Sequence, residues 1–314
     1  MSEKPCGFNP RIGLRPVREF PLQKPWAKRL SVTHPVLIAG PTASGKSALA
    51  MEIAARDGGV IVNADAIQVY DNWRILTARP PAEDEEALPH RLFGHVGRTH
   101  PYSVGEWLRE VEAILRGPER AIIVGGTGLY FRALTEGLAE IPPIPEEVRA
   151  QGNALREAGE MDVMRQALDA ESAARIDLAN PARVQRAWEV LQSTGRGIAA
   201  WQDDTPAPLL PPESCERLVF TAPKDWLSPR IERRFDMMLE EGALQEVEDN
   251  LPTWDPTLPS AKAIGAPELV TYLRGESSFE AARENAITAT RQFAKRQRTW
   301  FRARMKDWQP IDPD

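Results

Sequence analysis

A short glycine-containing stretch constrains the fold of this chain more than any other feature of its sequence. Gly40-Pro-Thr-Ala-Ser-Gly-Lys-Ser47 fits the pattern GxxxxGK[ST], follows the apolar run Val36–Ala39 and opens a helix-like stretch over Ser47–Arg56. In that setting, backbone N–H groups of the loop and the positive end of a helix bind a phosphate group. The stretch therefore predicts a P-loop, which binds a di- or triphosphate whatever else the ligand carries.

We expect the whole loop to contribute to binding this di- or triphosphate: Gly40, Pro41, Thr42, Ala43, Ser44, Gly45, Lys46 and Ser47. The Lys46 ammonium would place a point charge on the terminal phosphate, and the Ser47 hydroxyl would ligate Mg²⁺. Mg²⁺ is the cofactor that this loop predicts.

The sequence around the loop alternates between short apolar runs and helix-like stretches. Apolar runs recur at Val60–Val62 and Ala121–Val124, and Gly105–Arg116 has the character of a helix. This alternation predicts a parallel α/β sheet. Residues 146–194 have the pattern of several helices without a strand, whereas Arg217–Thr221 has that of a returning strand. The predicted fold class is α/β, with a P-loop NTPase-like parallel sheet core and an inserted all-helical domain.

Changes in composition divide the chain into an extension, a core and an insertion. Residues 1–33 are basic and interrupted by prolines, which is typical of a flexible N-terminal extension. Residues 34–140 and 213–314 would form the core, in which three helices follow the returning strand and the last runs from about Ser278 to Met305. Residues 141–212, bounded by proline-rich segments, would form the helical insertion.

Composition excludes several classes of protein. The chain has 314 residues, 42% of them hydrophobic, which is enough for one large domain with an insertion or for two domains. No apolar run approaches the roughly 20 residues that cross a bilayer, and prolines interrupt the N-terminal region where a signal peptide would lie. We therefore expect a cytoplasmic protein without a membrane partner, and we expect it to be a monomer.

Cysteine and histidine usage predicts no structural metal. Cys6 and Cys215 are too few for a disulfide framework or a Cys-rich zinc site, and the four histidines lack the HExxH spacing of a zinc site.

Charge is distributed unevenly along the chain. The formal net charge of −6 argues mildly against a nucleic-acid partner, yet residues 291–306 contain seven basic side chains and no acidic one. Within a helix Arg291, Lys295, Arg298 and Arg302 would share one face. Such a stripe is either a path for nucleic-acid phosphates or ordinary solvated surface.

Two further features bear on the chemistry at the loop. P-loop hydrolases have an apolar strand that ends in Asp, but here Ala121–Val124 is followed by Gly125-Gly126-Thr127, which favours a phosphate that departs as a leaving group. Asp65 follows the run Val60–Val62 and should lie at the carboxyl edge of the sheet, facing the loop. Its carboxylate could be a general base, a helix cap or an outer partner of Mg²⁺.

Motifs spread along the chain resemble those of one enzyme family. Besides the P-loop they include Asp65-Ala-Ile-Gln-Val-Tyr70, Val124-Gly-Gly-Thr-Gly-Leu-Tyr130, Arg230-Ile-Glu-Arg-Arg-Phe235 and Ala289-Thr-Arg-Gln-Phe-Ala-Lys-Arg-Gln297. From Pro35 to Trp308 the chain resembles the tRNA dimethylallyltransferases, also called tRNA isopentenyltransferases, of the bacterial type.

The resemblance implies both a reaction and its substrates. A dimethylallyl group would pass from dimethylallyl diphosphate to the exocyclic amine of the adenine 3′ of the anticodon, and diphosphate would be released. The partner would be the anticodon stem-loop of tRNA.

Roles for individual residues follow from matching positions in these motifs. The resemblance implies that Asp65 is the general base, that Ser47 is the P-loop hydroxyl, and that Thr127 and Arg234 help to bind substrate or diphosphate. The tRNA contacts that it implies are Asp65, Ala66, Ile67, Gln68, Thr127, Arg149, Arg183, Arg186, Lys262, Arg296, Arg298 and Arg302. Gln68 could pair with the adenine edge through its amide, although a simple turn residue would have the same sequence.

At three places the sequence departs from the family pattern. Ala66 replaces the usual Ser after the catalytic Asp, Asp177–Asn180 replaces the usual His-Pro-Asn-Asp, and Ala266-Pro267 replaces the usual Tyr and basic residue after Gly265. These changes concern tRNA contacts more than the reaction. Two other functions remain as alternatives, a P-loop small-molecule kinase and a non-catalytic RNA-binding P-loop protein.

Overall fold

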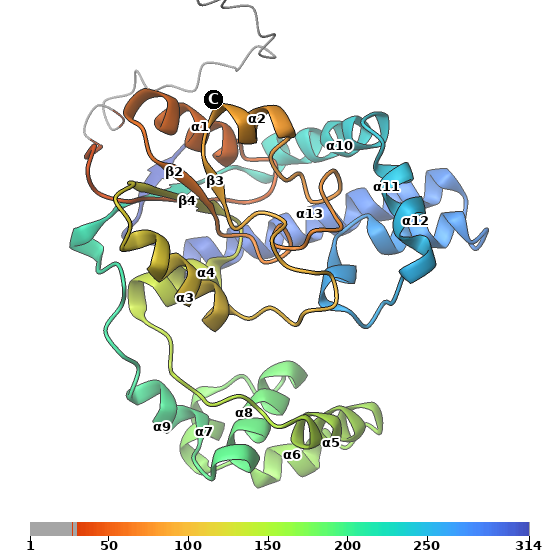
Figure 1. Cartoon of the computed structure of the whole chain (residues 1–314). Coiled ribbons are helices and arrows are strands. Elements are labelled where there is room, and N and C mark those ends of the chain that lie inside the picture. The colour runs from red at the N-terminus through yellow and green to blue at the C-terminus, as the bar shows by residue number, and fades with distance from the viewer. Residues whose placement is uncertain (1–26, 28–29, 314) are drawn as a thin grey trace, which may run out of the picture. The chain divides into compact units, whose positions relative to one another are not determined.

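The computed structural model describes residues 27 and 30–313 (Figure 1). The predicted flexible extension over residues 1–33 lies almost entirely outside these residues. Within the described part, no helix combines the length and the apolar character needed to cross a membrane.

A parallel sheet forms the centre of the fold (Figure 1). Its strands are β1 (Val36–Ala39), β2 (Val60–Asn63), β3 (His90–Arg91), β4 (Ala121–Gly125), β5 (Glu216–Phe220) and β6 (Gln309–Ile311). Six strands pair in the order β3-β2-β4-β1-β5-β6, and every pair is parallel. The predicted fold class is confirmed, because all the predicted strands are present within a residue or two of their expected bounds.

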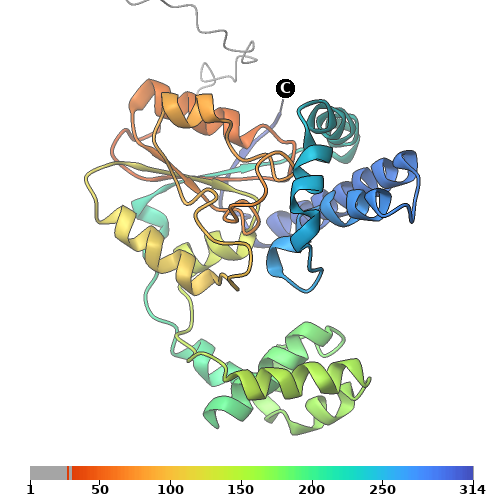
Figure 2. The same cartoon turned by 45° about the vertical axis from the view of Figure 1, so that its right-hand side comes forward.

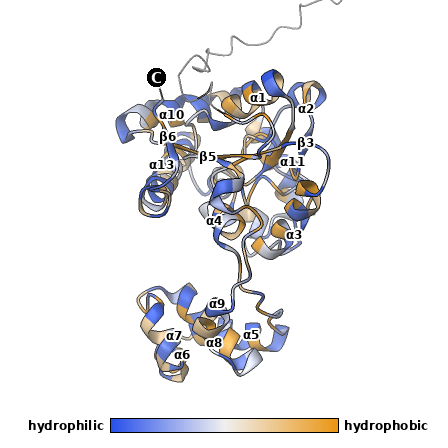
Figure 3. Ribbon diagram, turned by 90° about the vertical axis from the view of Figure 1, so that its left-hand side faces the viewer, coloured by the Kyte–Doolittle hydropathy of each residue, from blue (hydrophilic) through white to orange (hydrophobic). Residues whose placement is uncertain are grey.

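The sheet is buried because its central strands consist of apolar residues. Every residue of β1 and β4 is buried, as expected for strands with neighbours on both sides. Helix α1 (Lys46–Asp57) packs Leu49 and Ile53 against Ile122 of β4 and Leu218 of β5 in one apolar cluster. Figure 3 shows the apolar character of the sheet and the polar outer faces of the helices beside it.

Four α-helices follow β5, whereas the sequence predicted three. They are α10 (Lys224–Glu240), α11 (Ala243–Asn250), α12 (Ala266–Leu273) and α13 (Phe279–Arg304). These helices pack against one another around a second apolar core that contains Phe235, Leu269 and Ile287 (Figure 2). The region between the first and the last helix holds two short helices instead of one, α11 and α12, each eight residues long. Helix α11 lies directly after Gly242, whose φ is 105°. The final helix was predicted within a residue of its observed bounds.

Two compact units make up the chain. Among the described residues, the first contains residues 27, 30–102, 113–128 and 215–313, and the second contains residues 103–112 and 129–214. The second unit is helical, and its five helices after residue 140 are α5 (Glu146–Glu157), α6 (Met161–Ala167), α7 (Ala170–Arg175), α8 (Pro181–Thr194) and α9 (Ile198–Asp203). Met164, Val184 and Trp188 form its apolar centre.

The longest of the remaining elements is the amphipathic helix α3 (Val104–Leu115). The others are α2 (Ala82–Ala87), α4 (Gly128–Glu136) and the 3-10 turns at Pro212–Ser214, Leu251–Thr253 and Pro259–Lys262. In the second unit, Trp107 of α3 stacks on Tyr130 of α4 with ring centroids 4.4 Å apart.

Candidate active site

The predicted P-loop connects β1 to α1 and has the backbone of a phosphate cradle. Ala43 and Gly45 have φ values of 61° and 95°, so the chain folds back on itself before α1 begins at Lys46. The left-handed region favours glycine, and Ala43 adopts it at a cost that is typical of functional loops. Ser44 is fully buried, and its Oγ has no hydrogen-bond partner in the described part of the chain. A phosphate oxygen would give that hydroxyl the partner that it lacks.

Lys46 lies where its charge is poorly solvated. Burial lowers the pKa of its ammonium to about 8, the carboxylate of Asp65 raises this pKa, and the guanidinium of Arg234 lowers it further. Its Nζ donates to the Pro41 carbonyl oxygen at 3.5 Å. An anion bound in the loop would therefore restore favourable surroundings for the charged form.

Arg234 brings a second cation to the loop from α10. Its Nη1 donates to Thr42 Oγ1 at 3.4 Å. Burial lowers the pKa of its guanidinium and Asp65 opposes that effect, but an arginine keeps its charge at neutral pH. Ser47 is exposed in the first turn of α1, on the loop side of the helix. Two cations and the exposed hydroxyl of Ser47 thus accompany the backbone of the loop.

Asp65 is held in a turn just beyond β2 by groups from two chain segments. Its backbone N–H donates to the side-chain oxygen of buried Asn63 at 2.8 Å, and its own Oδ1 accepts from the Ile67 N–H at 3.0 Å. The next residue, Ala66, donates its N–H to Thr127 Oγ1 at 2.9 Å, and the Thr127 N–H donates to the Ala64 carbonyl at 3.1 Å. The turn after β4 therefore fixes the turn after β2.

The amide nitrogen of Gln68 is already hydrogen-bonded within the protein. Nε2 donates to the carbonyl oxygens of Thr77 and Ala78 at 2.8 and 3.1 Å. This arrangement leaves the side-chain oxygen as the group that could accept a hydrogen bond from a ligand. Bidentate pairing with adenine, which would need both ends of the amide, does not fit this geometry.

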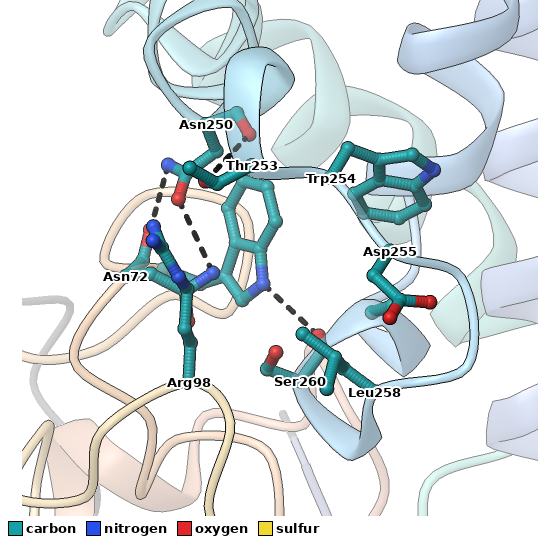
Figure 4. A pocket seen from close by; sticks show the side chains of 10 residues that line it. Asn72, Arg98, Asn250, Thr253, Trp254, Asp255, Leu258 and Ser260 are labelled. Carbon is teal, nitrogen blue, oxygen red and sulfur yellow. Dashed lines mark hydrogen bonds between the residues drawn. The ribbon is translucent and has the colours of Figure 1, made fainter.

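Hydrogen bonds from the C-terminal part of the chain hold the segment after β2 in place. Glu246 of α11 accepts the backbone N–H groups of Arg74, Ile75 and Leu76 at 2.5, 2.9 and 3.0 Å. A small hollow lies beside it, where the indole of Trp73 donates to the Ser260 carbonyl at 3.0 Å (Figure 4). These bonds attach the 3-10 turn that carries exposed Lys262 to the segment that holds Gln68.

The basic residues of α13 differ in whether they are free to contact a phosphate group. Arg296 and Arg302 are exposed and Arg298 is half-buried, and none of the three forms an ion pair in the described structure. Arg291 is different, because it lies 3.0 Å from Glu232 of α10 and also approaches Glu284. Only part of the predicted basic stripe is therefore free to meet a phosphate backbone.

Three arginines of the second unit carry the predicted tRNA contacts there. Arg149 of α5 and Arg183 of α8 are exposed. Arg186 is half-buried, and burial lowers the pKa of its guanidinium while Glu189 raises it. The three residues occupy two helices that pack together in this unit.

Three supporting residues were missed by the sequence analysis: Asn63, Glu246 and Gln297. Each binds backbone groups of a loop. Two of them had a signal in the sequence: Asn63 lies two residues before Asp65, and Gln297 ends the motif Ala289–Gln297, whereas Glu246 lies in no such motif.

Comparison with known proteins places this chain in a family. The profile of the IPP transferase family matches residues 68–304, and that of the isopentenyl transferases matches residues 34–93. The chain is 63% identical over 286 residues to the tRNA dimethylallyltransferase of Dinoroseobacter shibae, which covers 90% of this chain and 96% of that protein. The chain belongs to the tRNA dimethylallyltransferase family. It is also 61% identical over 278 residues to the tRNA dimethylallyltransferase of Cereibacter sphaeroides, covering 88% of this chain and 96% of that one.

Solved structures of tRNA dimethylallyltransferases share the fold. One is the full-length tRNA isopentenylpyrophosphate transferase of Bacillus halodurans, with a TM-score of 0.63, 29% identity and 89% of each chain covered. Another, described as a eukaryotic dimethylallyltransferase acting on tRNA, has a TM-score of 0.76 and 25% identity, covering 90% of this chain and 74% of that one. The family resemblance found in the sequence is confirmed.

Proposed function

We propose that this chain transfers a dimethylallyl group from dimethylallyl diphosphate to the exocyclic amine of the adenine 3′ of the anticodon in tRNA. One observation carries the proposal. The carboxylate of Asp65 lies at the same edge of the sheet as the P-loop, close enough to Lys46 and Arg234 to affect the pKa of both cations. An anion-binding loop and a base thus meet in one place.

The P-loop would bind the diphosphate. Its backbone amides and the N-terminus of α1 suit an anion, and Lys46 and Arg234 would stabilise the negative charge that grows on the leaving group. The unpartnered Oγ of Ser44 supports this assignment, since the loop has an unused hydroxyl where an oxygen ligand would bind.

Magnesium fits the same loop. In the described residues, no three His, Cys, Asp or Glu side chains gather into a metal site. Mg²⁺ is commonly held by few protein groups together with substrate phosphates, and the exposed hydroxyl of Ser47 could supply such a ligand. When bound, the ion would neutralise charge on the diphosphate oxygens.

Asp65 would act on the acceptor. The amine nitrogen of adenine forms a bond to C1 of the dimethylallyl group, and the bond between C1 and the diphosphate oxygen breaks with its electron pair going to diphosphate. The nitrogen loses one proton, which the Asp65 carboxylate would accept. Gln68 could receive a hydrogen bond from the amine through its side-chain oxygen, because its nitrogen is held by two carbonyl groups. Thr127 would keep its hydroxyl hydrogen for the substrate, since its oxygen already accepts from Ala66.

Binding of the tRNA anticodon stem-loop would use both parts of the chain. We assign the core, residues 34–140 and 213–314, to the reaction and the helical insertion, residues 141–212, to tRNA contacts through Arg149, Arg183 and Arg186. Lys262, Arg296, Arg298 and Arg302 would contact tRNA from the core. Exposure of most of these side chains supports the assignment. We expect the protein to act as a monomer, and a tRNA substrate would place the reaction in the cytoplasm.

Neither alternative function explains the site as well. A phosphotransferase or hydrolase with this loop would be expected to carry an Asp at the end of a core strand, but β4 ends at Gly125 and is followed by Gly126 and Thr127. A non-catalytic RNA-binding protein would have no use for a carboxylate close enough to two cations to raise the pKa of each.

A transfer assay tests the proposal. Purified protein is incubated with labelled dimethylallyl diphosphate, Mg²⁺ and unmodified tRNA, and the tRNA is then digested to nucleosides for mass spectrometry. We expect label in a prenylated adenosine from the position 3′ of the anticodon. Transfer of phosphate from ATP to a small molecule with no label in RNA would favour the kinase instead.

A further inference from the structure

A buried glutamine joins the P-loop to the turn after β4. Gln297 of α13 is only 6% exposed. Its Oε1 accepts the backbone N–H of Thr42 at 2.9 Å, and its Nε2 donates to the carbonyl oxygen of Gly126 at 3.0 Å. One side chain therefore bridges two loops that lie 255 and 171 residues away in the sequence.

The two hydrogen bonds of Gln297 lie just beyond the paired part of β1 and β4. The backbone of β1 and β4 is paired up to Gly40 and Gly125, whose N–H and carbonyl meet at 3.3 Å. Beyond that point the chain turns into the P-loop on one side and into Gly126-Thr127 on the other. Gln297 connects the two segments just past the last ladder bond, where the sheet no longer sets their separation.

Packing around the amide leaves little freedom. A Cβ atom on Gly126 would lie 2.2 Å from Nε2 of Gln297 and 3.2 Å from Oδ2 of Asp65. The turn, the amide and the carboxylate are therefore in close contact. Only glycine at position 126 permits this approach, because a contact of 2.2 Å is far inside van der Waals distance.

The two loops carry the two halves of the proposed reaction. Thr42 belongs to the loop that would hold the diphosphate, and its hydroxyl is approached by Arg234. Gly126 precedes Thr127, whose hydroxyl fixes the Asp65 turn. The distance between the donor carbon and the acceptor nitrogen depends on how these loops are placed relative to each other.

We propose that Gln297 is a positioning residue that holds the diphosphate loop and the Asp65 turn at the separation required for transfer. This proposal rests on the proposed function. Gln297 itself needs no contact with substrate, because its effect passes through Thr42 and Gly126. The consequence is a role in the rate of transfer rather than in the affinity for either substrate.

The chemistry of the bridge explains why an amide is suited to it. The Thr42 N–H requires an acceptor and the Gly126 carbonyl requires a donor, and an uncharged primary amide offers both. An ionised carboxylate of the same size offers acceptors alone. A thioether of similar length offers neither strong donor nor strong acceptor and leaves both backbone groups without a partner.

Two variants of the full chain test the proposal. We expect Gln297→Met to lower the single-turnover rate at saturating donor and tRNA by about 10²-fold, the scale expected when reacting groups shift by about 1 Å. The dissociation constants for tRNA and for dimethylallyl diphosphate should change far less than the rate. Gln297→Glu should lose activity at high pH and recover part of it as the pH falls, because a protonated carboxyl group can again donate to Gly126.

A control variant separates positioning from general destabilisation. Ile287→Ala removes a buried side chain from the same helix, ten residues before Gln297 in the sequence. It should lower the thermal midpoint yet keep a nearly wild-type rate at a temperature where the variant is folded. Hydrogen exchange at the Thr42 amide should become faster in Gln297→Met and stay unchanged in Ile287→Ala.

The results distinguish this proposal from the proposed function. A wild-type protein that transfers label, together with a Gln297→Met variant of equal single-turnover rate, would overturn the positioning role and leave the function standing. Loss of rate in Ile287→Ala as large as that in Gln297→Met would also overturn it. A wild-type protein that transfers no label would remove both proposals.

Discussion

The carboxylate of Asp65 raises the pKa of the Lys46 ammonium, opposing the larger effect of burial that brings that pKa to about 8. The base proposed for the acceptor and the cation proposed for the leaving group are thus electrostatically coupled. Binding of diphosphate would place a second anion beside Lys46. The charge state of this lysine should therefore respond to pH in the free protein and much less in the complex.

The affinity for dimethylallyl diphosphate should depend on pH through Lys46. Because the pKa of Lys46 is lowered to about 8, the free site keeps its charge below that pH and loses it above. Binding above pH 8 then requires uptake of a proton, so the dissociation constant should rise by up to about tenfold per pH unit. Equilibrium dialysis with labelled donor between about pH 7 and 9.5, without tRNA, measures this dependence.

Lys46→Arg is the matched control, since arginine stays charged throughout this range. Its donor affinity should vary little across the same pH range. An equally steep dependence in Lys46→Arg would assign the titration to another group.

Glu246→Gln should destabilise the loop after β2. The two carboxylate oxygens of Glu246 accept three backbone N–H groups, and an amide offers one acceptor oxygen and turns a donor toward the others. A buried N–H that loses its partner costs about 1–3 kcal/mol, so the free energy of unfolding should fall by about that amount. Urea denaturation measures it. Glu248→Gln, an exposed change on the same helix, should leave the free energy of unfolding nearly unchanged.

The final helix should contribute to the salt dependence of tRNA binding. Arg298→Ala with Arg302→Ala should weaken binding and lower the slope of log affinity against log salt by about 0.7 to 0.9 for each phosphate group that is no longer neutralised. Titration of tRNA by fluorescence anisotropy at several salt concentrations gives the slope. Arg291→Ala is the control, because Arg291 is already paired with Glu232 and should leave the slope as it is. An unchanged slope in the double variant would make these residues ordinary solvated surface.

Much of the fold could be predicted because parallel strands are buried on both faces. Val36–Ala39 and Ala121–Val124 are apolar throughout, and burial of every residue in these runs accounts for that pattern. Strands β3 and β6 were not predicted. They have two and three residues, lie at the two edges of the sheet, and contain His, Arg, Gln and Pro, which give no strand pattern.

The site was predictable where its chemistry is local in sequence. The P-loop residues are consecutive, and Asp65 lies two residues after the end of β2, so each position could be inferred from its neighbours. The residues that hold these loops in place could not be found in this way. Gln297 and Glu246 stabilise loops that lie 255 and 170 or more residues away in the sequence, and a buried amide or carboxylate on a helix has no local pattern that reveals its partner.

The proposed role of Asp65 in proton removal is the central claim, and Asp65→Asn tests it most directly. Asparagine keeps the size of the side chain and an oxygen that can accept from the Ile67 N–H, but it removes the basicity. Asp71→Asn, an exposed change six residues along the chain, serves as the control. Both variants should bind tRNA and dimethylallyl diphosphate in the presence of Mg²⁺.

The measurement is the single-turnover rate of dimethylallyl transfer with both substrates saturating. Loss of a general base should lower this rate by about 10² to 10⁴-fold in Asp65→Asn, while tRNA affinity stays near that of the wild type. Asp71→Asn should react at the wild-type rate. A rate in Asp65→Asn within a few-fold of the wild type would contradict the account and remove Asp65 from the proton transfer.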